Sequence, residues 1–281
     1  MELKDKADER TREQIQEHYQ IEKELANRLR QASKEQRRQL YPLVYDELFR
    51  RVPSHSMLIR KASAEETQKA AAAQMKFLRR FLKPDDTFLE VGPGDCALSF
   101  AVAAQVKRVF AVDVSSKITD NARQPSNFQL ILSDGCAIPL PAESVQVAYS
   151  NQLMEHLHPE DAFEQLQAIY RALAPGGIYI CITPNRVGGP YDISRHFDKV
   201  ATGFHLKEYT WRELSELFRR VGFSQVWSYM GIKGNFHRFP LLLFQFCEAS
   251  FALLPHGLRQ VLADALPMRL FLRIWIVGAK A

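Results

Sequence analysis

The stretch that decides the fold runs from residue 89 to residue 96 and reads Leu89-Glu90-Val91-Gly92-Pro93-Gly94-Asp95-Cys96. It closes a run with strand character and precedes a helical pattern that starts at residue 97. Glycines at such a turn let a ligand approach the backbone closely, and the first turn of a helix offers free N–H groups. The stretch therefore predicts a strand, a ligand-binding loop and a helix.

A second strand ends in an acidic residue at the spacing of a ribose-binding acid. Asp113 follows Gly92 by 21 residues, which is the arrangement found in doubly wound folds. Dinucleotide enzymes share this feature, so an NAD(P)-dependent oxidoreductase stays open as an alternative. Glu90 argues against that alternative, because a carboxylate at the mouth of the sheet would repel a pyrophosphate. It suits a ligand that carries a positive charge.

Beyond Thr87, short β-rich runs alternate with amphipathic helical patterns. This alternation predicts an α/β fold, with a doubly wound sheet covered by helices on both faces. The predicted strands are 87–91, 109–114, 128–133, 145–150, 178–183, 225–230 and 272–277, and the helices between them are about 97–105, 116–123, 160–173 and 210–221.

The chain before this region has a different pattern. Residues 1–82 contain no glycine, and their apolar residues recur at helical spacing. Dense Glu, Lys and Arg in the first forty residues are typical of a solvated helical face. We therefore expect a helical N-terminal cap over 1–82 and a second domain over 83–281.

The second domain contains an apolar insertion, predicted to be helical, at about residues 239–266. Two interpretations stay open for it. It packs on the core or forms a dimer helix, or it contacts a lipid-linked acceptor at a membrane surface. In the second case three nearby arginines would assist, namely Arg259, Arg269 and Arg273.

Taken in order, these motifs resemble those of class I S-adenosylmethionine-dependent methyltransferases. Glu90-x-Gly92-x-Gly94 resembles their first motif, Asp113 the ribose acid, and Ser133-Asp134-Gly135 the adenine loop. Cys96 departs from the pattern, since many members have glycine there. The resemblance covers roughly residues 85–231 and implies a seven-stranded sheet with the last strand antiparallel. It implies S-adenosyl-L-methionine as the cofactor, bound by Glu90, Gly92, Gly94, Asp113, Val114, Asp134, Gly135, Ser150 and Asn151.

The segment after the fourth predicted strand carries candidate catalytic residues. His156 is a natural base near neutral pH, with Glu155 and His205 as further candidates. Gln152-x-x-Glu155-His156, with the later His205, also resembles a metal-binding subset of the family. That subset includes ubiquinone-pathway O-methyltransferases (the type 11 branch) and small-RNA 3′-end 2′-O-methyltransferases.

In that subset, a Glu-x-x-Glu-His segment holds a divalent metal that binds the acceptor's hydroxyls. The resemblance implies a metal at Gln152, Glu155, His156 and His205, weakened because Gln152 replaces a charged Glu. A metal-free base and a structural role for these residues stay open beside it.

The loop from Pro184 to Lys207 is long, polar and aromatic, which is typical of a functional loop. Its arginines suit a phosphate or carboxylate on a substrate, or they pair with Asp192 or Asp198 on the surface. The predicted substrate-binding residues are Arg186, Tyr191, Arg195 and His196.

Composition limits the remaining functions. A net charge of +5, with bases and acids intermixed, gives no strong nucleic-acid signal. Four cysteines without a CxxC pair predict reduced thiols, and we expect a cytoplasmic monomer or homodimer without a leader or membrane span. The segment after the fourth strand lacks the Asn/Asp-Pro-Pro-Tyr/Phe pattern of amine methylation. The sequence therefore favours O-methylation of a small molecule, a sugar or glycan, or a lipid-linked acceptor, with a non-catalytic cofactor-binding module as a further alternative.

Overall fold

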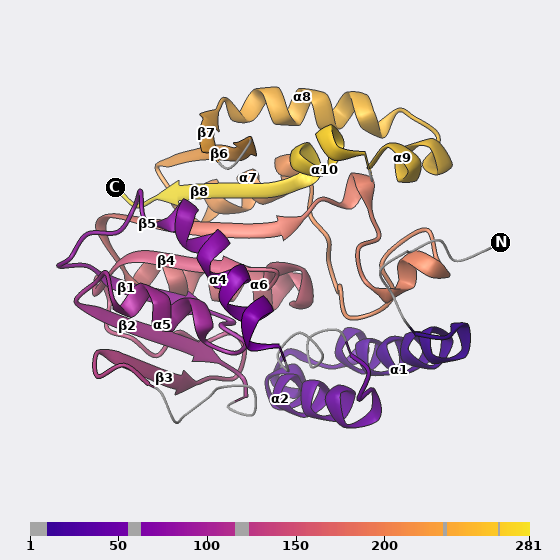
Figure 1. Ribbon diagram of the computed structural model, residues 1–281, viewed down its shortest axis with the longest axis horizontal. Helices are drawn as coiled ribbons and strands as arrows, with labels where there is room; N and C mark the ends of the chain where they lie inside the picture. The colour runs from indigo at the N-terminus through magenta and orange to yellow at the C-terminus, as the bar shows by residue number, and fades with distance from the viewer. Residues whose placement is uncertain (1–9, 56–62, 116–123, 233–234, 264) are drawn as a thin grey trace.

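The computed structural model describes residues 10–55, 63–115, 124–232, 235–263 and 265–281. Its centre is one eight-stranded sheet in the order β3-β2-β1-β4-β5-β8-β6-β7 (Figure 1). The strands are β1 (Thr87–Val91), β2 (Arg108–Asp113), β3 (Phe128–Leu132), β4 (Val145–Asn151), β5 (Leu173–Pro184), β6 (Gln225–Ile232), β7 (Asn235–Phe239) and β8 (Arg273–Ala279).

The predicted doubly wound α/β fold is confirmed, with one correction to the strand count. β1 to β5 pair in parallel, and β8 runs antiparallel to β5, as expected of the last strand. The eighth strand is β7, which pairs antiparallel with β6 at the edge of the sheet. Five residues of mixed polarity, with three of them exposed, give a weak strand signal in the sequence. The predicted helix at 116–123 lies outside the described residues.

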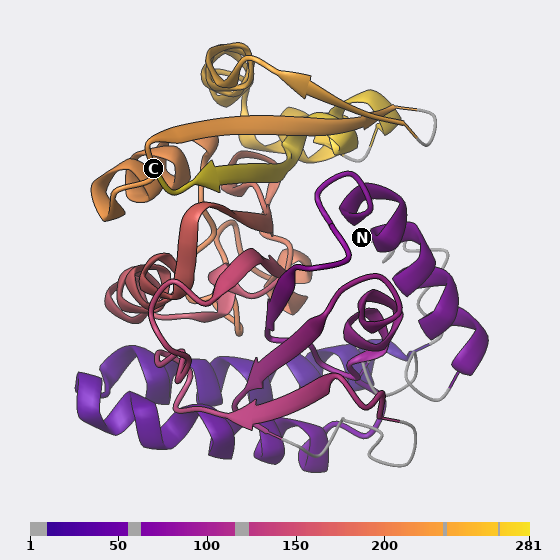
Figure 2. The same cartoon turned by 90° about the vertical axis from the view of Figure 1, so that its left-hand side faces the viewer.

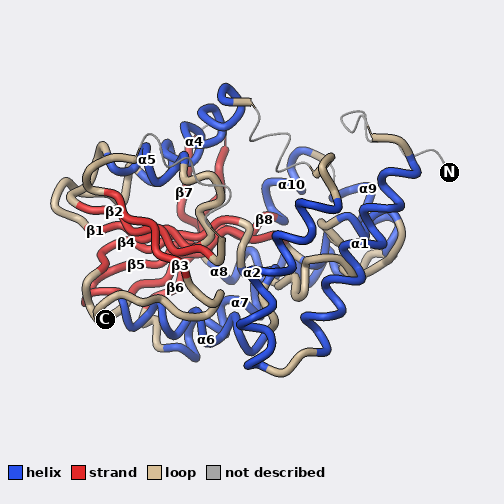
Figure 3. The backbone as a smooth tube through the Cα atoms, turned by 90° about the horizontal axis from the view of Figure 1, so that it is seen from below, coloured by secondary structure: helices blue, strands red, loops and turns tan. Residues whose placement is uncertain are grey.

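Helices cover both faces of the sheet (Figure 3). Successive strand residues point to opposite faces, so Phe88 joins one core and Leu89 the other. The first core packs against α4 (Ala64–Leu78) and α5 (Ala97–Ala103), and the second against α6 (Pro159–Ala172) and α7 (Trp211–Val221).

The N-terminal helices α1 (Arg12–Gln31) and α2 (Lys34–Arg51) lie near the β3 edge, opposite α8 (Figure 2). Each begins with a capping box, at Thr11 and at Ser33. The solvated face expected for this region is present on α1, where Glu13, Glu17 and Glu24 are exposed, and the opposite face buries eight side chains. Apolar residues at helical spacing carry that burial, and two polar side chains, His18 and Glu22, are buried with them.

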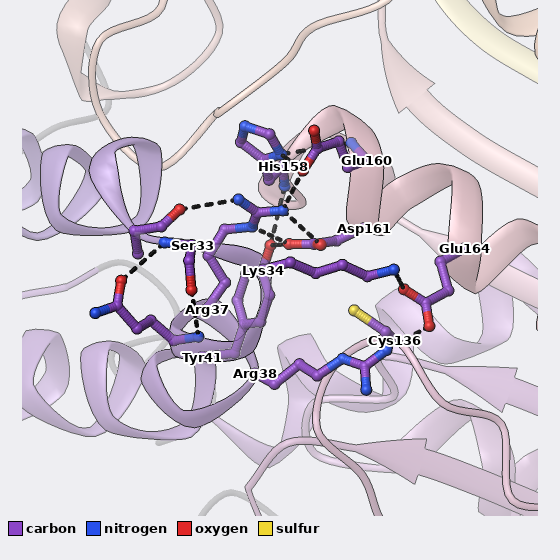
Figure 4. Close-up of polar contacts among 12 residues, drawn as sticks. Ser33, Lys34, Arg37, Arg38, Tyr41, Cys136, His158, Glu160, Asp161 and Glu164 are labelled. Atoms are coloured by element: carbon purple, nitrogen blue, oxygen red, sulfur yellow. Dashed lines mark hydrogen bonds and ion pairs between the residues drawn. The ribbon is translucent and has the colours of Figure 1, made fainter.

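A buried ion pair fastens α2 to α6 (Figure 4). Arg37 donates to Asp161 from Nε at 2.5 Å and from Nη2 at 2.9 Å, and the Tyr41 hydroxyl donates to the same carboxylate at 2.7 Å. Tyr41 also packs on Gly135, where an added Cβ would lie 3.0 Å from its ring. The N-terminal helices are therefore an integral part of the core around the predicted adenine loop.

The apolar segment between β7 and β8 folds into three helices, α8 (Leu241–Ala252), α9 (His256–Ala263) and α10 (Leu266–Leu272). In the part of the chain that the structure describes, no helix combines the length and apolar character needed to cross a membrane.

Candidate active site

A cavity of about 820 Å³ opens at the carboxyl ends of the parallel strands. The loop after β1 lines one side of it through Glu90, Gly92 and Gly94. His156, from the segment after β4, and His205 line it as well. Helices α1, α2, α4, α5 and α10 contribute further walls, so N-terminal and C-terminal segments line the same space.

The glycine loop needs backbone conformations that glycine favours. Gly92 and Gly94 have φ values of +69° and +58°. An added Cβ at Gly92 would meet Leu153 at 3.0 Å, whereas one at Gly94 would have no protein atom within 4 Å. Gly94 therefore leaves room for a ligand against the backbone. Cys96, the N-cap residue that precedes α5, adopts a φ of +61° without being glycine.

Glu90 lies buried at this end of the cavity. Its carboxylate accepts a hydrogen bond from the Ser99 hydroxyl at 2.5 Å. Burial, together with the negative charges of Asp95 and Asp113, raises the pKa of Glu90 to about 8. A positively charged ligand would lower the pKa of Glu90 again, because it stabilises the ionised carboxylate.

The predicted ribose and adenine residues lie beside the cavity and not on its wall. The Asp113 carboxylate accepts from the backbone N–H of Val114 at 2.7 Å, and that of Asp134 accepts from Cys136 and Ala137 at 2.9 and 2.8 Å. Tyr41 covers Gly135. Backbone N–H groups of these loops thus fix the carboxylates of Asp113 and Asp134, and α2 packs against the loop of Asp134 through Tyr41.

Two polar residues at the end of β4 differ in their surroundings. Ser150 is fully buried, and its hydroxyl lies 2.6 Å from the Tyr179 hydroxyl. Asn151 lines the cavity and accepts from Arg273 Nη2 at 3.2 Å. Of the two, Asn151 is placed to contact a ligand.

Glu155, His156 and His205 come together, with ligand atoms within 4.8 Å of one another. A short helix, η2 (Met154–His156), carries the first two. Glu155 is fully buried; its Oε2 accepts from the Thr183 hydroxyl at 2.9 Å, whereas its Oε1 has no hydrogen-bond partner among the described residues. An orphaned buried carboxylate oxygen needs a cation or a proton donor.

The two imidazoles are held by similar contacts, but only His156 offers an unshared electron pair near neutral pH, because the pKa of His205 is raised to about 9. His156 Nδ1 lies 3.2 Å from the Phe204 carbonyl oxygen, which can only accept, so Nδ1 carries the proton and Nε2 is free. His205 Nδ1 lies 2.7 Å from Glu208 Oε1 in the same arrangement. Carboxylate or carbonyl partners of this kind orient metal-bound imidazoles in proteins.

The pKa values of the two rings move apart. Burial, with His205 nearby, lowers the pKa of His156 to about 3. Burial opposes protonation of His205 too, but the hydrogen bond to Glu208 and the charges of Glu155 and Asp192 raise its pKa to about 9. A base as weak as His156 is poorly matched to a hydroxyl proton near neutral pH. Gln152 lines the same cavity, with a φ of +57°.

The described residues hold two further clusters that the sequence interpretation missed. His18, Glu22 and His55 line the cavity, but Arg10 Nη1 lies 2.7 Å from His18 Nδ1. A guanidinium only donates, so His18 Nε2 carries a proton and donates to Glu22 at 2.8 Å. The i, i+4 spacing of His18 and Glu22 was the available signal. The other cluster, Cys136, Asp161 and Glu164, is engaged by the cations of α2.

Helix α1 holds the backbone segment 202–205, which contains His205 and the carbonyl group of Phe204 that contacts His156. Arg30 donates to the carbonyl oxygens of Thr202, Gly203 and His205 at 2.8, 2.9 and 3.2 Å. Glu22 Oε2 accepts from the Phe204 N–H at 3.2 Å. Because Phe204 orients His156 in turn, the N-terminal helices position both imidazoles.

The structure brings three of the four predicted substrate-binding residues to the cavity and places the fourth elsewhere. Tyr191, Arg195 and His196 line the cavity, the last two from the short helix η4 (Ile193–His196). Arg186 lies elsewhere and pairs with Glu213 at 3.0 Å. Arg269 and Arg273, which the sequence associated with the insertion, line the cavity instead.

A family model described as "Methyltransferase domain" matches residues 89–181, from β1 into β5. The chain contains a class I S-adenosylmethionine-dependent methyltransferase domain. The match includes the glycine loop and the η2 segment, so the predicted family is confirmed on the residues that suggested it.

Relatives of this methyltransferase domain carry similar names. "Probable S-adenosylmethionine-dependent methyltransferase" proteins of Mycolicibacterium smegmatis and Mycobacterium tuberculosis are 31% identical over 138 residues and 28% identical over 139. These alignments cover 48% and 49% of this chain, and it spans about half the length of those relatives, 51% and 48%. A solved methyltransferase from Archaeoglobus fulgidus, 16% identical, shares the fold with a TM-score of 0.51 over 76% of this chain and 94% of its own.

Proposed function

We propose that this chain transfers the methyl group of S-adenosylmethionine to a hydroxyl oxygen of its acceptor. One observation supports the proposal most strongly. A single cavity joins the glycine loop and Glu90 to His156 and His205, and Glu155 lies buried directly behind these two histidines. Cofactor and acceptor could therefore meet inside one cavity, and bringing the two reactants together is the main requirement of a displacement reaction.

The proposed reaction is a displacement at the methyl carbon of the cofactor. The acceptor oxygen forms a bond to the methyl carbon while the bond from that carbon to sulfur breaks, and sulfur keeps the electron pair. S-adenosylhomocysteine leaves without the sulfonium charge, and the hydroxyl proton is released. Glu90 supports the cofactor because its buried carboxylate faces the positively charged methionine end.

The cluster suits a divalent cation. Glu155 Oε1, His156 Nε2 and, once its ring has released a proton, His205 Nε2 would hold it, and Thr183, Phe204 and Glu208 orient those three side chains. When bound, such a cation binds the acceptor hydroxyl and lowers its pKa. The orphaned Oε1 of Glu155 favours this role for the cluster over a metal-free base at His156.

Methyl transfer from labelled S-adenosylmethionine to a matched alcohol, phenol, carboxylic acid and amine tests the oxygen acceptor. We expect label in an ether product. Label confined to the amine would contradict the proposal.

Titration with Mn²⁺, with Glu155→Gln as the variant and the exposed Glu160→Gln as the control, tests the cation. We expect binding that Glu155→Gln abolishes and Glu160→Gln retains. Full turnover in excess chelator would exclude the cation and leave His156 as the proton acceptor.

A further inference from the structure

The three C-terminal helices carry an unusual number of exposed apolar side chains. Among the described residues, eleven large apolar side chains are exposed, and seven of them lie between residues 242 and 270. We call these seven residues the apolar surface: Leu242, Leu243, Phe246, Leu253, Leu258, Val261 and Leu270. Soluble surfaces seldom gather apolar side chains in this way without a binding role.

Helix α8 has one buried apolar face and one exposed apolar face, and the exposed face belongs to the apolar surface. It buries Leu241, Phe244 and Phe251 against the protein. Leu242 and Phe246, one turn apart, and Leu253, seven residues after Phe246, lie on its other side and are 77%, 71% and 87% exposed. The helix forms the outermost layer above β6 and β7 (Figure 1). An ordinary surface helix would be polar on this side.

The C-terminal segment that carries the apolar surface is basic. From residue 235 to residue 281 the sequence has two acids, Glu248 and Asp264. Glu248 is buried and accepts from Asn185 Nδ2 and from the Trp211 N–H, both at 2.6 Å. The same stretch has five basic residues, namely Arg238, Arg259, Arg269, Arg273 and Lys280. The complement of an apolar surface with basic surroundings is an apolar interior beneath negative headgroups.

The cavity reaches the molecular surface beside these helices. Arg269 and Arg273 line the cavity and are also exposed to solvent. Leu270, in the same helix, belongs to the apolar surface, and α9 packs against α10. A molecule held at the apolar surface would therefore lie next to the opening of the cavity.

We propose that the apolar surface docks on an anionic lipid bilayer, so that the cavity opens toward the lipid headgroups. The acceptor is then an amphiphile carried in that bilayer. Only this assignment of the acceptor rests on the proposed methyl transfer; the docking stands independently of it.

Co-sedimentation of the full chain with lipid vesicles tests the docking. The vesicles are phosphatidylcholine alone or phosphatidylcholine mixed with phosphatidylglycerol. We expect binding to the mixed vesicles that added salt weakens, because the basic side chains contribute part of the attraction. Phe246→Asp with Leu253→Asp should weaken it about tenfold or more, and replacement of the exposed Arg238, as Arg238→Ala, about fivefold.

The matched control places the same charges elsewhere, as Leu43→Asp with Leu132→Asp, both 57% exposed and outside this surface. That variant should bind vesicles like the unaltered chain. All variants are also titrated with S-adenosylmethionine, and unchanged cofactor binding shows that they are folded. If cofactor binding fails in every protein while docking persists, the proposed function fails and the docking stands.

Three results would overturn the docking. They are no binding to either vesicle, binding that the Phe246 and Leu253 substitutions leave unchanged, and self-association without vesicle binding that those substitutions abolish. The last result, read by light scattering, would assign the surface to a second copy of the chain.

Discussion

Glu90 connects the electrostatics of the cavity to the charge of the proposed ligand. Its carboxyl group is buried, accepts from Ser99 and has a pKa raised to about 8. In the free protein at pH 7 it is therefore mostly protonated. A cationic cofactor favours the ionised form, so binding should release a proton.

We predict that the affinity for S-adenosylmethionine rises with pH until it levels off above the raised pKa of about 8. The sign follows because the bound state holds fewer protons than the free state; the slope is at most about tenfold per pH unit. Calorimetric titration at several pH values measures it.

Glu90→Gln is the control for this dependence, since the ammonium group of the cofactor titrates in the same window. The slope of the variant reports the cofactor alone. Identical slopes in the two proteins would show that Glu90 does not face the positive charge.

Gly94 provides a steric test of the cofactor loop. A Cβ there meets no protein atom within 4 Å, so Gly94→Val should cost mainly the backbone strain of its φ of +58°, about 1–2 kcal/mol. If the cofactor lies against this backbone, its affinity should fall about tenfold or more. Calorimetry and urea unfolding separate the two effects, and a variant that binds the cofactor normally would place the cofactor elsewhere.

At the scale of elements, α1 acts on the site from a distance. Arg30 donates three hydrogen bonds to the 202–205 backbone that precedes and includes His205. We predict that Arg30→Ala lowers kcat about tenfold, because misplaced catalytic groups lose orientation. The dissociation constant of the cofactor should stay unchanged.

Arg28→Ala is the matched control, because Arg28 lies on the same helix and pairs with Glu47 at 2.7 Å. Its kcat should stay near that of the unaltered enzyme. Equal losses in both variants, or a loss confined to cofactor binding, would contradict the positioning role of Arg30.

The sheet was predictable because each parallel strand has a local signature. Buried β-rich runs, glycine turns and capping boxes such as that of Thr210 and Glu213 depend on neighbours in sequence. Each predicted strand is present, with ends that shift by a few residues. β7 was missed because its pairing with β6 gives it little burial of its own.

The site was only partly predictable, because some of its contacts join residues that lie far apart in the sequence. The motif residues Glu90, Gly92, Gly94 and His156 line the cavity. Local sequence does not reveal that Arg186 pairs with Glu213, more than twenty residues away along the chain. Nor could it show that α1 brings His18 and Glu22 to the site, since their burial depends on tertiary packing.

At the scale of the molecule, the Arg37–Asp161 pair joins the N-terminal helices to the sheet domain. The side chains are 3% and 0% exposed. Asp161→Asn leaves a buried guanidinium without its main counter-charge, so we predict a loss of about 3–5 kcal/mol in the free energy of unfolding. Urea unfolding measures it.

The exposed pair of Arg51 and Glu24, 2.9 Å apart, is the comparison. Glu24→Gln should cost less than about 1 kcal/mol, because solvent screens that pair. Similar losses for Asp161→Asn and Glu24→Gln would mean that α2 is not anchored through Asp161.

The central claim is that the cavity at the carboxyl ends of the strands binds S-adenosylmethionine. Calorimetric titration of the full chain with S-adenosylmethionine, S-adenosylhomocysteine and NAD tests it most directly, with Gly94→Val alongside. The structure predicts saturable binding of the first two, weakened in the variant, and no binding of NAD. Binding of NAD alone, or of none of the three, would contradict the assignment.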